Sequence, residues 1–271
     1  MNKKLLMGLA AFFVLWVIVL VIWTFGRGKV FSQASQDTGS VSALMMQAKA
    51  FEAKDKWFDA KKTYQKLIRD FPNSNAVMNW QKRLEEINLT LLFSPAVTAG
   101  SLLYEIRPGD TLTKIAKEFK TTPDLIMRSN QMSSDRLMPE RKIKVWTVPF
   151  TIVVDKSGNL LFLKTNEEVF KTYVVATGLN NSTPVGNFKI TNKLLNPTWF
   201  KAGTVVPPGS PENILGTRWM GFDISGYGIH GTTEPQSLGR QVTQGCVRML
   251  NAEVEELYTI VPVGTEVTIV D

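Results

Sequence analysis

The chain has 271 residues but only one histidine, His230, and one cysteine, Cys246, which lie 16 positions apart. A thiol becomes a useful nucleophile near neutral pH when a base or a positive neighbour helps to form the thiolate. Imidazole is the side chain best suited to be that base. The pair therefore predicts a nucleophile and its base, although a single cysteine is also a common buried apolar residue and a histidine before glycine is often a turn residue.

Other chemistry suits the pair less well. A zinc site needs three or four protein ligands, and no nearby carboxylate spacing completes one, so we expect neither a metal nor a cofactor. An intrachain disulfide would need a second cysteine. Sixteen residues are too many for one helical face, so the two side chains must come from two strand ends joined by a loop. Residues 232–242 are polar and contain proline and glycine, as such a loop would.

The neighbouring residues supply other parts that acyl transfer requires, namely a group that orients the imidazole and donors for an oxyanion. Gly231 offers its backbone carbonyl to the ring. Gly245 and Cys246 offer backbone N–H groups, and glycine permits the backbone angles that a tight turn needs. Arg248 is two residues beyond the thiol on the same side of a strand. It is a candidate to bind a substrate carboxylate or to stabilise the thiolate, with a surface charge as the alternative.

The whole pattern resembles the catalytic domain of the YkuD-type L,D-transpeptidases over residues 150–271. The residues that carry the resemblance are His230-Gly231 and Gly245-Cys246-Val247-Arg248-Met249, with Thr183-Pro184-Val185-Gly186 upstream and Thr243 at a position that is Ser or Thr in the family. The resemblance implies that Cys246 is the nucleophile, that His230 is the base with Gly231 beside it, and that Gly245, Arg248 and Thr243 serve the oxyanion or the substrate. Gln244 departs from the many members with a second histidine there.

The resemblance also implies an activity. The Cys246 thiolate would attack the carbonyl before the terminal D-alanine of a peptidoglycan tetrapeptide stem, and an amine of a second stem would resolve the thioester into a 3→3 cross-link. Such enzymes are carbapenem targets. The same acyl-enzyme would make an L,D-carboxypeptidase if water resolved it, or would attach a protein to the wall. A sortase is a more distant enzyme alternative, and a non-catalytic wall-binding scaffold is the alternative from another class.

Residues 102–148 resemble a LysM domain. The run from Tyr104-x-Ile106 through Gly109-Asp110-Thr111-Leu112 to Ile115-Ala116 carries the resemblance and predicts a strand, two helices and a second strand. Leu112, Ile115, Ala116 and Phe119 form the apolar face of the first helix, which we expect Asp110 to cap; Thr122-Pro123 opens the second helix. The resemblance implies binding to a glycan that contains N-acetylglucosamine, such as peptidoglycan. Glu140 stands where the family usually has glycine.

Residues 41–92 have helical periodicity, with two helices folded about residues 54–56 and a third after Pro72. The run from Ala60 to Ser74 resembles a tetratricopeptide repeat, which implies a helical spacer and a docking surface for a protein partner. Residues 28–40 and 93–101 are expected to be linkers.

Residues 5–25 form an uncharged apolar run long enough to cross a bilayer. We expect residues 1–27 to be an uncleaved anchor in a bacterial cytoplasmic membrane, single-pass, with the remaining chain outside the cytoplasm. The net charge of +7 suits attraction to anionic surfaces, but no interleaving of basic and aromatic residues suggests a nucleic-acid partner.

The fold class is therefore multidomain: one transmembrane helix, an α-helical spacer, a small βααβ domain and a mainly β catalytic domain. In the last of these, residues 150–154 and 160–163 flank a turn and predict a hairpin. Residues 169–177 and 267–270 predict further strands. Asn251 with Glu253 after it predicts a capped helix. A β-sandwich or barrel-like sheet with this one long helix fits best.

Overall fold

The computed structural model describes residues 39–166, 168–201 and 203–271. The chain divides into two compact units, residues 1–81 and residues 82–271. The predicted membrane anchor at residues 5–25 lies outside the described residues. Within the described ranges, no helix combines the length and the apolar character needed to cross a membrane.

The described part of the first unit is helical, as the periodicity predicts. Residues 39–52 are helical, and helix α2 (Trp57–Asp70) follows a turn in which Asp55 has a left-handed backbone (φ +54°). Ala60, Tyr64 and Leu67 form the buried face of α2. Helix α3 (Val77–Leu92) starts in this unit and continues into the second unit.

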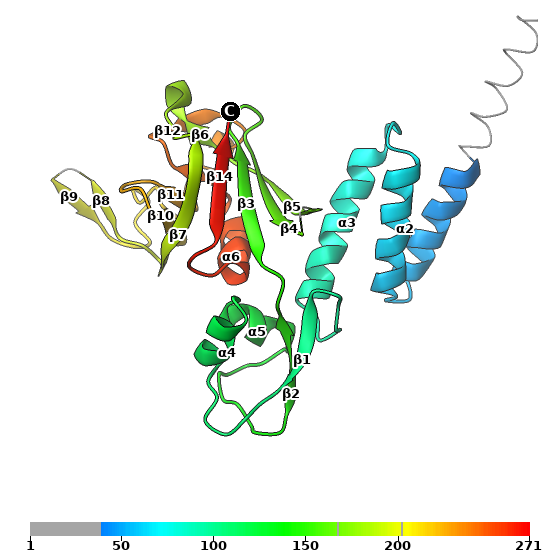
Figure 1. Cartoon of the computed structure of the whole chain (residues 1–271). Helices are drawn as coiled ribbons and strands as arrows, with labels where there is room; N and C mark the ends of the chain where they lie inside the picture. Colours follow the sequence, from blue (N-terminus) through cyan, green and yellow to red (C-terminus); the bar gives the residue numbers. More distant parts are fainter. Residues whose placement is uncertain (1–38, 167, 202) are drawn as a thin grey trace, which may run out of the picture. The chain divides into compact units, whose positions relative to one another are not determined.

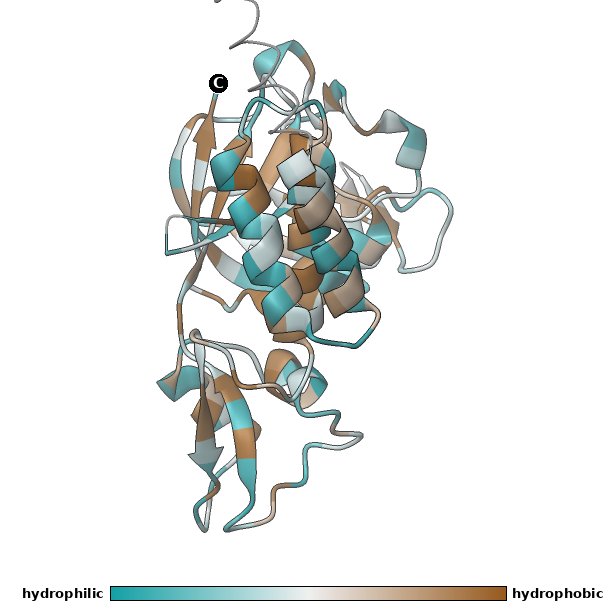
Figure 2. Cartoon of the chain, turned by 90° about the vertical axis from the view of Figure 1, so that its right-hand side faces the viewer, coloured by the Kyte–Doolittle hydropathy of each residue, from teal (hydrophilic) through white to brown (hydrophobic). Residues whose placement is uncertain are grey.

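The strand–helix–helix–strand prediction for residues 102–148 is confirmed. The elements are β1 (Ser101–Glu105), α4 (Leu112–Glu118), α5 (Pro123–Ser129) and β2 (Lys142–Trp146), and β1 pairs antiparallel with β2. Leu112, Ile115 and Ala116 are buried, and Phe119 packs against them. Figure 2 shows both apolar and polar segments on the two strands, and Tyr104, Ile143 and Val145 of these strands are buried in the core of the domain.

In this small domain the predicted cap of the first helix is wrong, and the predicted start of the second helix is correct. The side chain of Thr111, not Asp110, caps α4 by accepting a hydrogen bond from the amide of Lys114 (3.2 Å). The Asp110 carboxylate instead accepts from the Tyr104 hydroxyl (2.9 Å) and from a backbone amide within the preceding turn. Helix α5 begins at Pro123 as predicted, with the Thr122 hydroxyl accepting from the amide of Leu125 (2.9 Å).

The C-terminal domain is mainly β with one long helix among its described residues, as predicted. Its strands form a single curled sheet in the order β13-β11-β10-β7-β14-β3-β4-β5, and the pairs β12-β6 and β8-β9 form two small ribbons (Figure 1). The strands are β3 (Phe150–Asp155), β4 (Leu160–Thr165), β5 (Glu168–Val174), β6 (Thr177–Gly178), β7 (Gly186–Leu195), β8 (Trp199–Lys201), β9 (Thr204–Val206), β10 (Arg218–Phe222), β11 (Gly228–His230), β12 (Gln241–Thr243), β13 (Val247–Arg248) and β14 (Glu266–Val270).

Helix α6 (Asn251–Ile260) packs its apolar side, Val254, Leu257 and Ile260, into the core. The predicted cap is wrong: the N-cap position is Leu250, and Asn251 is the first helical residue. The Asn251 side chain is used elsewhere, because its Oδ1 accepts hydrogen bonds from the backbone amides of Thr217 and Thr232.

The small βααβ domain shares one apolar core with the C-terminal domain. Trp146 stacks on Phe150, with ring centroids 5.3 Å apart, and meets Phe170 edge-on. The Thr122 hydroxyl also donates to the carbonyl of Thr259 at the end of α6. Contacts between aromatic rings stabilise such an interface beyond the buried area alone. The two domains of the second unit are therefore packed together directly.

The second half of α3 covers the edge of the large sheet. Strand β5 ends that sheet, and an edge strand leaves backbone groups unpaired. The Glu85 carboxylate accepts from the amide and the hydroxyl of Thr172 (3.1 and 2.8 Å), and the Asn88 amide donates to the carbonyl of Phe170 (3.1 Å). This helix therefore satisfies backbone groups that water would otherwise have to bind.

Lys144 joins the end of α3 to strand β2. Its side chain is 1% exposed, and Nζ donates to the carbonyls of Leu91 (2.7 Å), Leu92 (3.2 Å) and Ser94 (2.8 Å). The carbonyls of Leu91 and Leu92 belong to the C-terminus of α3, which favours a cation. Burial lowers the pKa of Lys144 to about 8, so the ammonium is still charged at neutral pH.

Lys144→Met should therefore lower the free energy of unfolding by about 2–3 kcal/mol, because it keeps the apolar stem but leaves buried carbonyls without a donor. Urea unfolding measures this change. Lys142→Met is the matched control on the same strand, since the Lys142 side chain is 62% exposed, and it should change stability by less than about 0.5 kcal/mol. Equal effects of the two substitutions would contradict the role of Lys144.

Glu140, which stands in place of the expected glycine, has a left-handed backbone (φ +70°) and donates its amide to the carbonyl of Ile106 (2.9 Å). A residue with a Cβ is strained there. Glu140→Gly should therefore raise the free energy of unfolding by up to about 1 kcal/mol. Glu140→Ala removes the charge but keeps Cβ, so it should not stabilise the protein. If both variants raise the melting temperature equally in thermal unfolding, the charge of Glu140 and not its backbone conformation is the cause.

Candidate active site

Strands β11 and β13 bring the histidine and the cysteine together. They pair in parallel, with Ile229 opposite Val247 and His230 opposite Arg248. Cys246 directly precedes β13, so the two side chains come from neighbouring strands and not from one helix or one turn. Residues 231–246 form the connection, which contains a short 3-10 helix (Pro235–Ser237) and strand β12.

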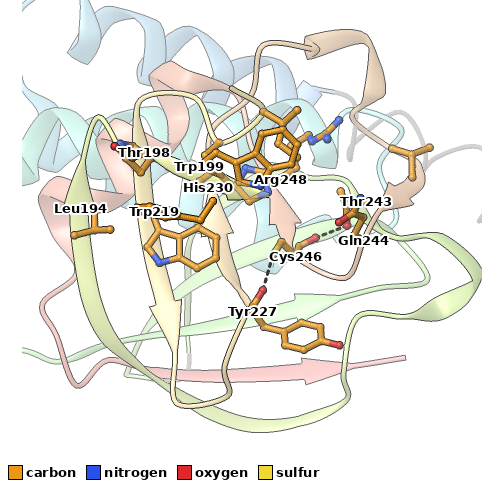
Figure 3. A pocket seen from close by; sticks show the side chains of 16 residues that line it. Leu194, Thr198, Trp199, Trp219, Tyr227, His230, Thr243, Gln244, Cys246 and Arg248 are labelled. Carbon is orange, nitrogen blue, oxygen red and sulfur yellow. Dashed lines mark hydrogen bonds between the residues drawn. The ribbon is translucent and has the colours of Figure 1, made fainter. Parts of the chain in front are cut away.

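Both side chains line one cavity of about 660 Å³, shown in Figure 3. Thr243, Gln244 and Arg248 line it too, whereas Gly231 and Gly245 lie beside it in the backbone. The remaining lining residues come from β7, β8 and the segment before it, the loop between β9 and β10, the β10–β11 region and β12: Leu194, Pro197, Thr198, Trp199, Phe200, Ile214, Leu215, Trp219, Gly226, Tyr227 and Val242. A cavity of this size accommodates a peptide segment.

The His230 ring is buried and held on two sides. Its Nδ1 lies 2.7 Å from the carbonyl oxygen of Gly231, and the Trp219 ring stacks against it at 6.1 Å between centroids. Burial lowers the pKa of His230 to about 4, outweighing the opposite effect of the Gly231 carbonyl. The ring is thus neutral at pH 7. With Nδ1 directed at Gly231, Nε2 is the nitrogen available to accept a proton.

Cys246 is half-buried, and its thiol donates to the carbonyl oxygen of Gly226 over 3.4 Å. Burial raises the pKa of the Cys246 thiol, and the amide of Gly228 and the charge of Arg248 oppose this only in part. The cavity therefore holds a neutral thiol and a neutral imidazole in the resting state. Such a pair can react if the imidazole removes the proton as the sulfur attacks.

The turn before the thiol is fixed by Thr243. Its hydroxyl donates to the carbonyl of Cys246 (2.7 Å) and accepts from the amide of Gly245 (3.2 Å). Gly245 has φ +128°, and a Cβ there would lie 2.6 Å from the Tyr227 ring. Only glycine fits this position, where the chain both turns and touches an aromatic ring. The Gly245 amide is engaged within the turn, and Thr243 holds the turn together.

Arg248 is buried and tied to the connection between the two strands. Its Nη1 donates to the carboxylate of Glu234 (2.7 Å) and to the hydroxyl of Ser237 (3.0 Å). Its Nε is buried without a hydrogen-bond partner in the described structure. Arg248 therefore anchors the connection through Glu234 and Ser237, and it also lines the cavity.

Sequence reasoning missed Trp219, Tyr227 and Glu234, and it assigned Asn251 only as a helix cap. Trp219 and Tyr227 come from strand β10 and from the turn before β11, and nothing in their spacing relates them to Cys246. Glu234 lies in the polar loop, and its negative charge is the one feature of the sequence that could have suggested it as a partner of Arg248. Phe200, at the β8–β9 hairpin, also lines the cavity and is 76% exposed. Among the described residues, no three His, Cys, Asp or Glu side chains gather in a way that could hold a metal ion.

The pKa directions predict how the free thiol reacts. Because the pKa of Cys246 is raised and that of His230 is lowered, alkylation by iodoacetamide should accelerate steadily as the pH rises from 6 to 9, by about tenfold per unit while the thiol is mostly protonated. The single cysteine makes mass spectrometry of the intact protein sufficient. A rate that is already constant between pH 5 and 7 would indicate a thiolate–imidazolium pair and contradict the neutral pair.

Comparison with known proteins covers the same regions. Residues 149–269 match the L,D-transpeptidase catalytic domain, residues 104–146 the LysM domain and residues 42–74 the tetratricopeptide repeat. The chain is 36% identical over 175 residues to "Putative L,D-transpeptidase YkuD" of Bacillus subtilis, covering 62% of this chain and 98% of that protein. It is 44% identical over 126 residues to "Putative L,D-transpeptidase YqjB" of the same species, covering 44% of this chain and 70% of that protein.

A solved L,D-transpeptidase from Mycobacterium smegmatis is similar at 19% identity and a TM-score of 0.39, over 49% of this chain and 64% of that chain. The extent of the similarity to the Bacillus subtilis protein, which spans nearly its whole length, decides the assignment. The chain belongs to the L,D-transpeptidase family.

Proposed function

We propose that this protein cross-links peptidoglycan as an L,D-transpeptidase, with Cys246 as nucleophile and His230 as base. The observation that carries the proposal is that the only thiol and the only imidazole of the chain line one cavity, with the imidazole buried and neutral. A neutral base beside a protonated thiol is the resting state that a proton-coupled attack requires.

In the first step, His230 Nε2 takes the thiol proton while the sulfur forms a bond to the carbonyl carbon before the terminal D-alanine of a tetrapeptide stem. The C–N bond to D-alanine then breaks, and its nitrogen leaves with the proton held by His230. A thioester remains on Cys246. The amide of Cys246 is the proposed oxyanion donor, since the amide of Gly245 already binds Thr243.

In the second step, an amine of a neighbouring stem attacks the thioester carbon and gives its proton to His230. The C–S bond breaks, the sulfur recovers a proton, and a 3→3 cross-link forms. Arg248 lines the cavity, which supports a contact between its guanidinium and a substrate carboxylate or carbonyl. This contact would leave the Glu234 ion pair in place, since that pair uses Nη1.

The LysM domain supports a polymeric substrate. We propose that it holds the glycan while the catalytic domain processes the stem, and the shared core around Trp146 and Phe150 would fix the distance between the two. Holding one part of a polymer raises the effective concentration of the other. The apolar run at residues 5–25 supports attachment to the cytoplasmic membrane with the catalytic domain outside it. A protein partner on residues 41–92 stays a prediction.

The test uses purified protein and disaccharide-tetrapeptides, with released D-alanine and products followed by mass spectrometry. The wild type should release D-alanine and form tetrapeptide–tripeptide dimers, whereas Cys246→Ala should lower the rate more than about 1,000-fold, because the nucleophile is lost. Lys142→Met, on the exposed face of the LysM domain, is the control and should keep the wild-type rate.

Release of D-alanine by Cys246→Ala at the wild-type rate would overturn the proposal. Release by the wild type without any dimer, even with excess stems, would reassign the protein as an L,D-carboxypeptidase. If the wild-type protein releases no D-alanine and its thiol forms no adduct with a carbapenem, the result would favour the non-catalytic scaffold.

A further inference from the structure

We propose that Asn251 is the positioning residue that sets the orientation of His230, and that it acts through the peptide group between Gly231 and Thr232. No sequence motif used above includes Asn251, and its place at the start of α6 first suggested a helix cap. The assignment rests on the proposed role of His230 as the base.

The two contacts that carry the proposal are made by one peptide group, the one between Gly231 and Thr232. The Thr232 amide donates to Asn251 Oδ1 over 3.0 Å, and the carbonyl oxygen of Gly231 lies 2.7 Å from His230 Nδ1. The carbonyl and the N–H of a trans peptide lie in one plane and point in opposite directions. Fixing the N–H with Asn251 therefore fixes the direction of the carbonyl that receives the imidazole.

The position of Asn251 Oδ1 also depends on its neighbours Gly231 and Thr217. A Cβ at Gly231 would lie 2.1 Å from Asn251 Oδ1, so glycine at 231 is needed for the amide to approach. Asn251 Oδ1 also accepts from the amide of Thr217 (3.3 Å), which precedes strand β10. Asn251 thus joins the start of β10, the end of β11 and the start of α6 at one oxygen atom.

The consequence concerns the tautomer of the imidazole. A carbonyl oxygen only accepts, so Nδ1 must carry the proton and Nε2 must be free to act as base. The hydrogen bond from Thr232 to Asn251 also polarises the peptide group, which makes its carbonyl a better acceptor. Asn251 does for His230, across one peptide bond, what a carboxylate in direct contact does for the histidine of a hydrolase triad.

The experiment uses protein labelled with ¹⁵N-histidine, because a single histidine gives one set of ring signals. In the wild type at pH 7, Nδ1 should be protonated and Nε2 unprotonated. In Asn251→Ala the signals should shift toward the other tautomer, and acylation of Cys246 by a carbapenem should slow about 10- to 100-fold, the range seen when outer groups that orient a metal-bound imidazole are removed. Asn251→Asp keeps an oxygen acceptor and should retain the Nδ1–H tautomer.

Asn88→Ala is the matched control, since Asn88 is 5% exposed and binds the carbonyl of Phe170 at the far edge of the sheet. It should lower the melting temperature without changing the ring signals. If Asn251→Ala does not fold, Asn251→Ser, whose hydroxyl is one atom too short, makes the same measurement.

Protonated Nε2 in the wild type, or unchanged ring signals in the Asn251 variants, would overturn the proposal. Slower acylation with unchanged ring signals would also overturn it, because Asn251 would then be merely structural. The ring signals do not depend on turnover. A wild type that shows the Nδ1–H tautomer, loses it in Asn251→Ala and yet releases no D-alanine would keep this inference and reject the proposed function.

Discussion

The parallel pairing of β11 with β13 is the interaction on which the site depends. It places His230 opposite Arg248, with Cys246 one residue before the second strand. Parallel neighbours cannot be joined by a tight hairpin, so the chain between them must leave the sheet and return. That excursion is the 232–242 segment, and Arg248 holds it through Glu234 and Ser237. The geometry that brings the imidazole and the thiol to one cavity thus also creates the segment beside that cavity.

Burial then decides the chemical state of the pair. Trp219 covers the imidazole, and the strand lies within the sheet, so the charged form of His230 is disfavoured and its pKa falls to about 4. The same burial raises the pKa of the thiol. A site of this kind avoids a permanently exposed thiolate, because the charge forms only when a substrate carbonyl can receive the sulfur. The neutral pair follows from desolvation more than from any one contact.

The domains around the site are packed more closely than their sequence motifs suggest. The LysM domain contributes Leu125 and Trp146 to the core of the catalytic domain, and α3 satisfies the edge strand β5 through Glu85 and Asn88. Lys144 connects the LysM domain to α3, because it lies on β2 and binds the last carbonyls of α3. The LysM domain is therefore held at a fixed position relative to the catalytic domain.

The sequence by itself determined the helices and strands with strong periodicity, the order of the domains and the two side chains proposed to react, because these depend on local pattern and on rare residue types. It misassigned Asp110 and Asn251 as caps, since a polar residue before a helix has the same local signal whether its side chain turns to the helix or to a distant amide. Only the tertiary structure decided that Trp219 buries His230, that Glu234 pairs with Arg248 and that Asn251 meets Thr232. These contacts join residues on different strands, loops and a helix, which no local sequence pattern relates to one another.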